Sequence, residues 1–207
     1  MSVQAYVAEA VRRGIASGEL LPGQRLVESQ LGDELGASRG MVRAALMRLV
    51  HEGLLEQIPN AGVRVRVIEP DEAAQIAEVC LTLQILCAGK AARLIGEADL
   101  AQLRNLGDRL RRAAEVVDLP GFEQTASDVD DLVVRVSAQR VATDVVGRLR
   151  VRIACLRRRV LLREGGLAAA ALRYEALLDA ITCGDAERAE AAMAAMAAAY
   201  PAGTDGG

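Results

Sequence analysis

The chain has 207 residues, of which 52% are hydrophobic and only 2% aromatic, with no Trp. Its net charge of −3 at pH 7 excludes a protein that coats nucleic acid through a uniformly basic surface, so any nucleic-acid contact must come from a local patch. The abundance of Ala, Leu, Val and Arg favours packed helices over an all-β sandwich, and we predict a mainly α fold.

The first part of the chain predicts two short helices joined by a tight turn. Apolar residues recur at helical spacing over residues 5–17, and Gly18 ends this helix. A second helix is predicted over residues 27–35, with Gly36 directly after it. This arrangement, followed by a third helix, is typical of a helix-turn-helix.

The third helix is predicted to begin after Ser38 and to end before Gly53. The Ser38 hydroxyl is suited to accept a hydrogen bond from an amide in the first turn. Arg39 and Arg43 lie four residues apart and therefore share one face. The opposite face is apolar and is expected in the core: it contains Val42, Ala45, Leu46 and Leu49.

A β-hairpin is expected to follow the third helix. Residues 54–58 and 63–68 have the composition of strands, and the turn between them contains Pro59, Asn60 and Gly62. Residues 1–69 are therefore predicted to form a winged helix-turn-helix with a small β-hairpin.

A second domain is predicted to begin at Pro70, which should break the preceding strand, with Asp71 as a helix cap. Short connectors between its amphipathic segments favour an antiparallel bundle of about six helices over residues 70–200, and the Gly-rich residues 201–207 are predicted to be a flexible tail. The predicted helices span residues 72–95, 99–117, 121–139, 143–163, 168–182 and 186–199.

The sequence is expected to lack membrane-spanning segments, a signal peptide and paired-cysteine motifs, and these absences guide the predictions of localisation and redox chemistry. We expect no apolar run long enough to cross a bilayer and no signal-peptide core, which predicts a cytoplasmic protein without a membrane partner. The four cysteines form no C-x-x-C pair, so buried thiols are favoured over a redox pair of Cys80 and Cys87.

The chain resembles the GntR-type bacterial transcription regulators, in the FadR-type branch that carries an all-helical effector-binding (FCD) domain. The resemblance covers nearly the whole chain. Its strongest part is a series of strings in a fixed order: residues 17–26, residues 31–39, Val42-Arg43, Ala45-Leu46, Arg48-Leu49 and Glu52-Gly53-Leu54.

The resemblance implies a homodimeric, sequence-specific regulator of transcription, by default a repressor, that binds a palindromic double-stranded DNA operator. Arg39 and Arg43 match the family's main contact positions, and an arginine can donate two hydrogen bonds to guanine. Many members have Thr-Pro in place of Gly40-Met41, so we expect an altered operator preference. The predicted DNA-binding residues are Ser38, Arg39, Gly40, Met41, Arg43, Asn60 and Gly62.

The resemblance also implies a pocket in the helical domain, where most relatives bind a metal through one Asp and three His. The single histidine, His51, lies in the first domain, so counting excludes that site, and we expect neither metal nor cofactor. We expect a pocket for a small, largely hydrophobic effector, or one that has collapsed onto its side chains. The matching positions are Asp130, Val134, Tyr174 and Met196, with Cys80 and Gln84 on the first helix of that domain.

Two residue types in this domain have alternative interpretations. Asp130 should have a raised pKa if it is buried, unless Tyr174 or an arginine hydrogen-bonds it, but it could equally be an exposed acid beside Asp128 and Asp131. The arginine run over residues 148–163 is interpreted as a solvated helix face.

Three alternatives to an effector-controlled regulator stay open. A constitutive DNA-binding or partner-binding protein would have a degenerate pocket. A metal-dependent sensor or an enzyme would need a site in the helical domain, yet no set of nucleophile, base and orienting residue is visible there, so we do not expect an enzyme.

Overall fold

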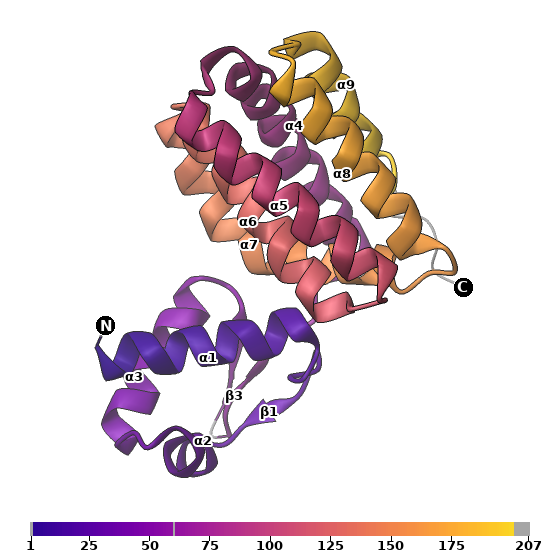
Figure 1. The fold of residues 1–207 in the computed structure, drawn as a ribbon. Helices are drawn as coiled ribbons and strands as arrows, with labels where there is room; N and C mark the ends of the chain where they lie inside the picture. The colour runs from indigo at the N-terminus through magenta and orange to yellow at the C-terminus, as the bar shows by residue number, and fades with distance from the viewer. Residues whose placement is uncertain (1, 60, 201–207) are drawn as a thin grey trace. The chain divides into compact units, whose positions relative to one another are not determined.

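The computed structural model describes residues 2–59 and 61–200, which form nine helices and three short strands (Figure 1). The predicted mainly α fold class is confirmed. The chain divides into two compact units, residues 1–69 and 70–207. Asn60 and the predicted tail lie outside the described residues.

The first unit contains a helix-turn-helix and a small sheet. Its three strands pair antiparallel in the order β1-β3-β2, with Arg25 opposite Arg64 and Glu56 also opposite Arg64 on the other side. The sequence predicted only the hairpin, because a strand of two residues has no alternation to recognise. Its elements are α1 (Val3–Ser17), β1 (Arg25–Leu26), α2 (Glu28–Leu35), α3 (Arg39–His51), β2 (Leu55–Ile58) and β3 (Gly62–Val65).

Caps and one small residue set the positions of α2 and α3. The Ser38 hydroxyl accepts a hydrogen bond from the Met41 amide at 3.4 Å, so α3 begins directly after it. Gly36 ends α2 in the left-handed conformation, with φ of 62°. Gly32 is buried, and a Cβ there would lie 2.9 Å from the Ala37 carbonyl oxygen. The turn between the two helices therefore depends on a residue without a side chain at this point.

The core of the first unit is formed by aliphatic side chains of α1 and α3. Val7, Val11, Val42, Leu46 and Leu49 are at most 1% exposed. Because these residues recur at helical spacing, burying them fixes which face of α3 points to solvent.

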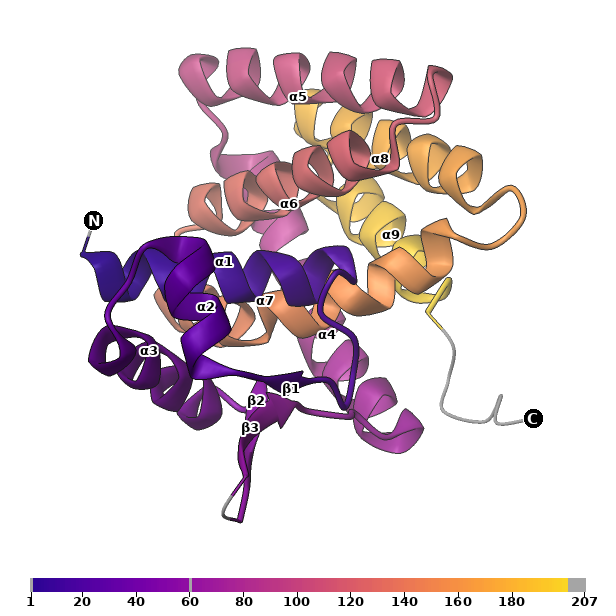
Figure 2. The same ribbon diagram turned by 90° about the horizontal axis from the view of Figure 1, so that it is seen from below.

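The second unit is the expected bundle of six helices (Figure 2). The helix α4 packs against four of the others, α6, α7, α8 and α9. Pro70 does not only end the preceding segment, as predicted: it is the first residue of α4, where its missing amide costs no hydrogen bond. The helices are α4 (Pro70–Leu94), α5 (Glu97–Glu115), α6 (Leu119–Val136), α7 (Arg140–Leu161), α8 (Gly166–Thr182) and α9 (Ala186–Ala197).

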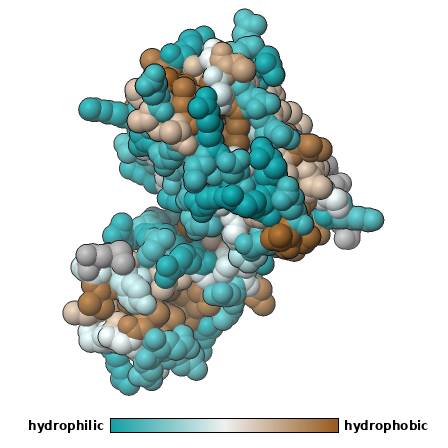
Figure 3. Space-filling model, viewed as in Figure 1, coloured by the Kyte–Doolittle hydropathy of each residue, from teal (hydrophilic) through white to brown (hydrophobic). Residues whose placement is uncertain are grey.

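The helix α4 is long and apolar enough, by length and composition, to cross a membrane. The expectation that no apolar segment has the required length was therefore wrong for this helix. Half of its most apolar stretch is buried within the unit. Length and composition alone do not distinguish a membrane-spanning helix from a buried core helix. Figure 3 shows a largely hydrophilic surface with smaller hydrophobic patches on the face in view.

Candidate functional site

The first half of α3 presents two arginines, a glycine and a methionine to solvent, directly after the exposed cap Ser38. Ser38, Arg39, Gly40, Met41 and Arg43 are all exposed, whereas the apolar positions that alternate with them are buried. The N-terminus of the helix is thus open, and its free amides and positive dipole end favour an anion such as a phosphate.

Arg43 is held by a side chain that the sequence did not single out. Its Nε donates to both carboxylate oxygens of Glu28, at 3.0 and 3.2 Å, and its Nη2 donates to Oε2 at 3.0 Å. The hydrogen bond and charge of Glu28 raise the pKa of Arg43. The only sequence signal for this contact was an acid in the first turn of α2. Within the described residues, no such contact holds Arg39.

The hairpin carries the remaining predicted contact residues. Gly62 is exposed and has φ of 86°, a conformation that a residue with a Cβ rarely adopts. Asn60 lies outside the described residues. Arg64 on β3 is ion-paired with Glu56 on β2 at 2.7 Å.

The late part of α3 is structural. Arg48 donates to Glu52 at 3.0 Å, and Arg12 of α1 donates to the same carboxylate at 2.7 Å. His51 makes a local contact of 2.7 Å between Nδ1 and the Met47 carbonyl oxygen. These contacts join the end of α3 to α1 and to its own last turns.

The helical unit contains a polar cluster of four residues, called the buried cluster below: Arg157 and Tyr174 are buried, and Asp130 and Ser127 are partly buried. The Arg157 Nη1 donates to Asp130 Oδ2 and to the Tyr174 hydroxyl, both at 2.8 Å. Its Nη2 donates to the Ser127 hydroxyl at 3.0 Å. The Tyr174 hydroxyl donates to Asp130 Oδ1 at 3.3 Å. The side chains of Arg157 and Asp130 are only 7% and 13% exposed.

Charges within the cluster oppose the cost of burial. Burial raises the pKa of Asp130, and the Arg157 guanidinium and Tyr174 hydroxyl limit that rise. Burial alone would lower the pKa of Arg157, but Tyr174 and Asp130 raise it, so the guanidinium stays charged. Burial, reinforced by the Asp130 charge, raises the pKa of the Cys80 thiol to about 12, which makes this thiol unreactive.

Arg157 is the main functional-site residue that the sequence interpretation missed, and its assignment to a solvated face was wrong. It is 6% exposed, because it lies four residues after the buried Ile153 and therefore on the core face of α7. Its neighbour Arg158 is half-buried and pairs with Glu123 at 2.6 Å. Helical spacing from Ile153 and Leu156 was the signal that could have identified Arg157.

The structure places the six predicted pocket residues inside the helical unit, but only some meet. Asp130 and Tyr174 are hydrogen-bonded, and Met196 lines a cavity of about 30 Å³ together with Tyr174 and Arg157. Such a cavity holds about one water molecule. The pocket prediction itself stays a prediction. The other three predicted pocket residues, Cys80, Gln84 and Val134, are buried on α4 and α6, and of these Cys80 interacts electrostatically with Asp130.

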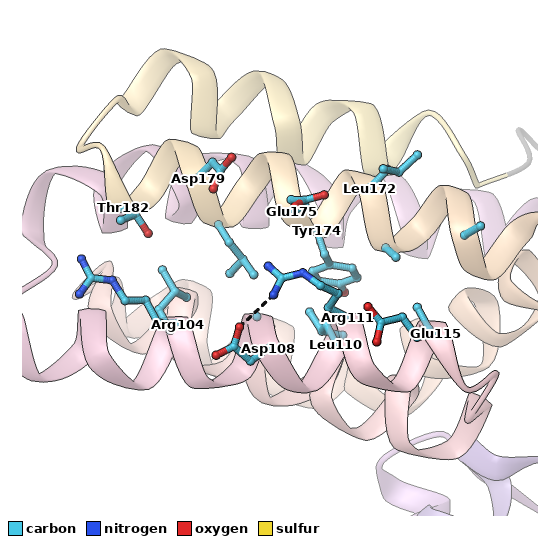
Figure 4. A pocket seen from close by; sticks show the side chains of 16 residues that line it. Arg104, Asp108, Leu110, Arg111, Glu115, Leu172, Tyr174, Glu175, Asp179 and Thr182 are labelled. Carbon is cyan, nitrogen blue, oxygen red and sulfur yellow. Dashed lines mark hydrogen bonds and ion pairs between the residues drawn. The ribbon is translucent and has the colours of Figure 1, made fainter.

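A larger groove of about 650 Å³ lies between α5 and α8 (Figure 4). Leu103, Leu110 and Leu178 contribute apolar surface, and two further lining residues, Arg111 and Asp108, form an ion pair at 3.0 Å. The Tyr174 side chain reaches this groove and also the buried cluster. Of the six predicted pocket residues, Tyr174 alone lines it.

Among the described residues, no three His, Cys, Asp or Glu side chains lie together in a way that could hold a metal ion. At the buried cluster the positive charge beside Asp130 comes from Arg157 instead.

Comparison with known proteins identifies both units. The family description "Bacterial regulatory proteins, gntR family" matches residues 4–65, and "FCD domain" matches residues 75–199. An HTH-type transcriptional regulator from the TAR-I ttuE-ttuC' intergenic region of Agrobacterium vitis is 28% identical over 133 residues, or 63% of this chain and 78% of that protein.

McbR of Escherichia coli (strain K12), an HTH-type transcriptional regulator, is 29% identical over 58% of this chain and 54% of its own length. The solved structure of E. coli McbR/YncC superimposes with a TM-score of 0.86 at 23% identity, covering 96% of this chain and 94% of that one. The E. coli (strain K12) mannosyl-D-glycerate transport/metabolism system repressor MngR is 46% identical over 61 residues, 29% of this chain and 25% of that protein.

These matches cover the winged helix-turn-helix and nearly all of the bundle, and they confirm the resemblance drawn from the sequence. The chain belongs to the GntR family of transcriptional regulators, in the branch that carries an FCD domain.

Proposed function

We propose that this DNA-binding transcription regulator acts in the cytoplasm as a homodimeric repressor that binds a palindromic operator through paired α3 helices. The observation that supports this most strongly is the exposed first half of α3, with Arg39 and Arg43 on one face and an apolar core on the other. Two-fold symmetric proteins bind symmetric sites, so each α3 would contact one half-site.

The proposed contacts follow from the chemistry of this face. Arg39 and Arg43 donate to base edges in the major groove, where guanine offers O6 and N7. Ser38 and the helix N-terminus contact a phosphate, and Gly62 and Asn60 of the hairpin approach the adjacent minor groove. Met41, which is 46% exposed, is suited to touch a thymine methyl group. Repression is supported by MngR, a relative that is named a repressor.

A binding-site selection from a random duplex library tests the DNA part of this proposal. We expect the wild-type protein to enrich an inverted repeat whose half-sites contain guanine, with about one helical turn between their centres. Recovery of a direct repeat, or of no sequence at all, would contradict a symmetric operator. Repeating the selection at higher salt checks specificity, because binding to phosphates alone weakens steeply with ionic strength.

We further propose that a small, largely hydrophobic effector binds the groove between α5 and α8 and not the centre of the bundle. A groove of about 650 Å³ falls within the usual range for ligand sites, whereas the cavity beside Met196 holds about 30 Å³. At the centre of the bundle, the Arg157 side chain fills space, and its positive charge is paired with Asp130. Tyr174 would connect an occupied groove to the buried cluster, since it contacts both.

A thermal-shift screen of lipophilic and carboxylate metabolites tests the effector proposal. We expect a stabilising ligand to lose its effect in Ala171→Trp, which fills the groove, and to keep it in Ala191→Trp, an exposed position on α9. A ligand that stabilises both variants equally would place its site elsewhere. Operator affinity measured with and without such a ligand distinguishes an effector from a passive ligand, because only an effector has different affinities for the two states.

A further inference from the structure

Glu28 lies on α2, and its carboxylate accepts hydrogen bonds from both Nε and Nη2 of Arg43 on α3. The pair is at the surface: the Arg43 side chain is 70% exposed and that of Glu28 is 30% exposed. An exposed ion pair adds little to folding stability, so this contact needs another explanation. A carboxylate beside a DNA-facing helix also repels DNA phosphates and so weakens DNA binding. We therefore look for a role of Glu28 in DNA recognition.

The geometry of the pair leaves the correct edge of Arg43 available. Glu28 occupies the edge formed by Nε and Nη2, through contacts of 3.0 to 3.2 Å. In the part of the chain that the structure describes, no hydrogen bond occupies the edge formed by the two Nη atoms. That edge presents two parallel N–H groups, the pattern that binds O6 and N7 of guanine.

We propose that Glu28 is a positioning residue that holds the Arg43 guanidinium with its outer edge toward the bases, and so determines how sharply Arg43 discriminates guanine. A free arginine side chain samples many rotamers and loses that freedom on binding. Arg43 has already lost part of its rotamer freedom in the absence of DNA, because the planar Glu28 carboxylate fixes the plane of the guanidinium. Arg39 has no such contact within the described residues and is expected to keep its freedom until it binds. This inference rests on the proposed role of Arg43 as a base-contacting residue.

The test compares Glu28→Gln with Glu34→Gln. Both variants remove one negative charge from α2, but within the described residues Glu34 has no contact with Arg43. The probes are the duplex selected by the wild-type protein and the set of duplexes in which each guanine of its half-site is replaced in turn. Binding of each duplex is measured by fluorescence anisotropy at fixed salt.

We expect Glu28→Gln to reduce discrimination at one guanine per half-site by about tenfold, within the range of a good bidentate contact. Glu34→Gln should change the affinity for all duplexes by the same small factor and leave the discrimination intact, since a charge change acts on every sequence alike. In an Arg43→Ala background, Glu28→Gln should have no further effect on discrimination, because the two residues act through one contact.

Suppose that Glu28→Gln discriminates between the duplexes as well as wild type does, whereas Arg43→Ala loses discrimination. This result would overturn the positioning role of Glu28 and leave the proposed function intact. A reduction that persists in the Arg43→Ala background would also overturn it, since Glu28 would then act on another group. If the wild-type protein selects no sequence, both this inference and the proposed function fail. Circular dichroism of each variant controls for folding.

Discussion

Replacing Arg157 by Met should destabilise the helical unit by about 3–5 kcal/mol, the usual cost of removing one partner from a buried ion pair. The variant keeps an unbranched side chain of similar length, but Asp130 would remain buried without the cation that lies 2.8 Å from it. Tyr174 and Ser127 would each lose a hydrogen bond from the guanidinium as well. Urea unfolding followed by circular dichroism measures the change.

The matched control is Arg150→Ala, on the same helix. Arg150 pairs with Asp131 at 2.7 Å, but both side chains are about half exposed, at 50% and 51%. This substitution should cost less than about 1 kcal/mol, because solvent screens the pair. If the two variants had the same free energy of unfolding, the buried cluster would stabilise the fold no more than an exposed ion pair does.

The effect of Arg157→Met should also depend on pH, with a sign that follows from Asp130. Burial raises the pKa of Asp130 above its ordinary value, and loss of Arg157 removes the main group that limits this rise. A carboxyl whose pKa is higher in the folded than in the unfolded state favours folding at low pH and loses that contribution as pH rises. The stability gap between variant and wild type should therefore shrink as pH falls toward the acid range. A double variant, Arg157→Met with Asp130→Leu, should recover much of the loss at neutral pH.

Arg43→Ala should reduce affinity for the selected operator by on the order of 100-fold or more, since a dimer would lose one bidentate base contact in each half-site. Folding should be unaffected, because Arg43 is exposed and its only described contact is with Glu28. Fluorescence anisotropy on the operator duplex measures the loss, and thermal unfolding monitors the fold.

Arg48→Ala provides the control on the same helix. Arg48 is exposed but pairs with Glu52 near the end of α3, away from the N-terminal half that is proposed to enter the groove. Its removal should lower operator affinity by less than about tenfold and leave base discrimination unchanged, as expected for a residue with at most a phosphate contact. Full operator affinity in Arg43→Ala would refute the assignment of α3 as the base-reading helix.

The winged helix-turn-helix could be predicted from the sequence because its signals are local. Caps such as Ser38 and stops such as Gly36 act on neighbouring residues, and the apolar spacing of α3 determines which face is buried. For the same reason the helices of the second unit were predicted within a few residues of their observed bounds. The two-residue strand β1 escaped prediction, since it exists only through its pairing with β3.

The sequence by itself determined which side chains point outward from α3, and it excluded a three-histidine metal site by its single histidine. Only the tertiary structure decided which groups meet. Glu28 and Arg43 lie 15 residues apart, and Asp130 lies 27 residues from Arg157 and 44 from Tyr174. Periodicity assigns a residue to a face of its own helix but carries no information about the side chains of the facing helices. Arg157 can be buried because α6 and α8 supply a carboxylate and hydroxyls to it, and that condition is set by packing alone.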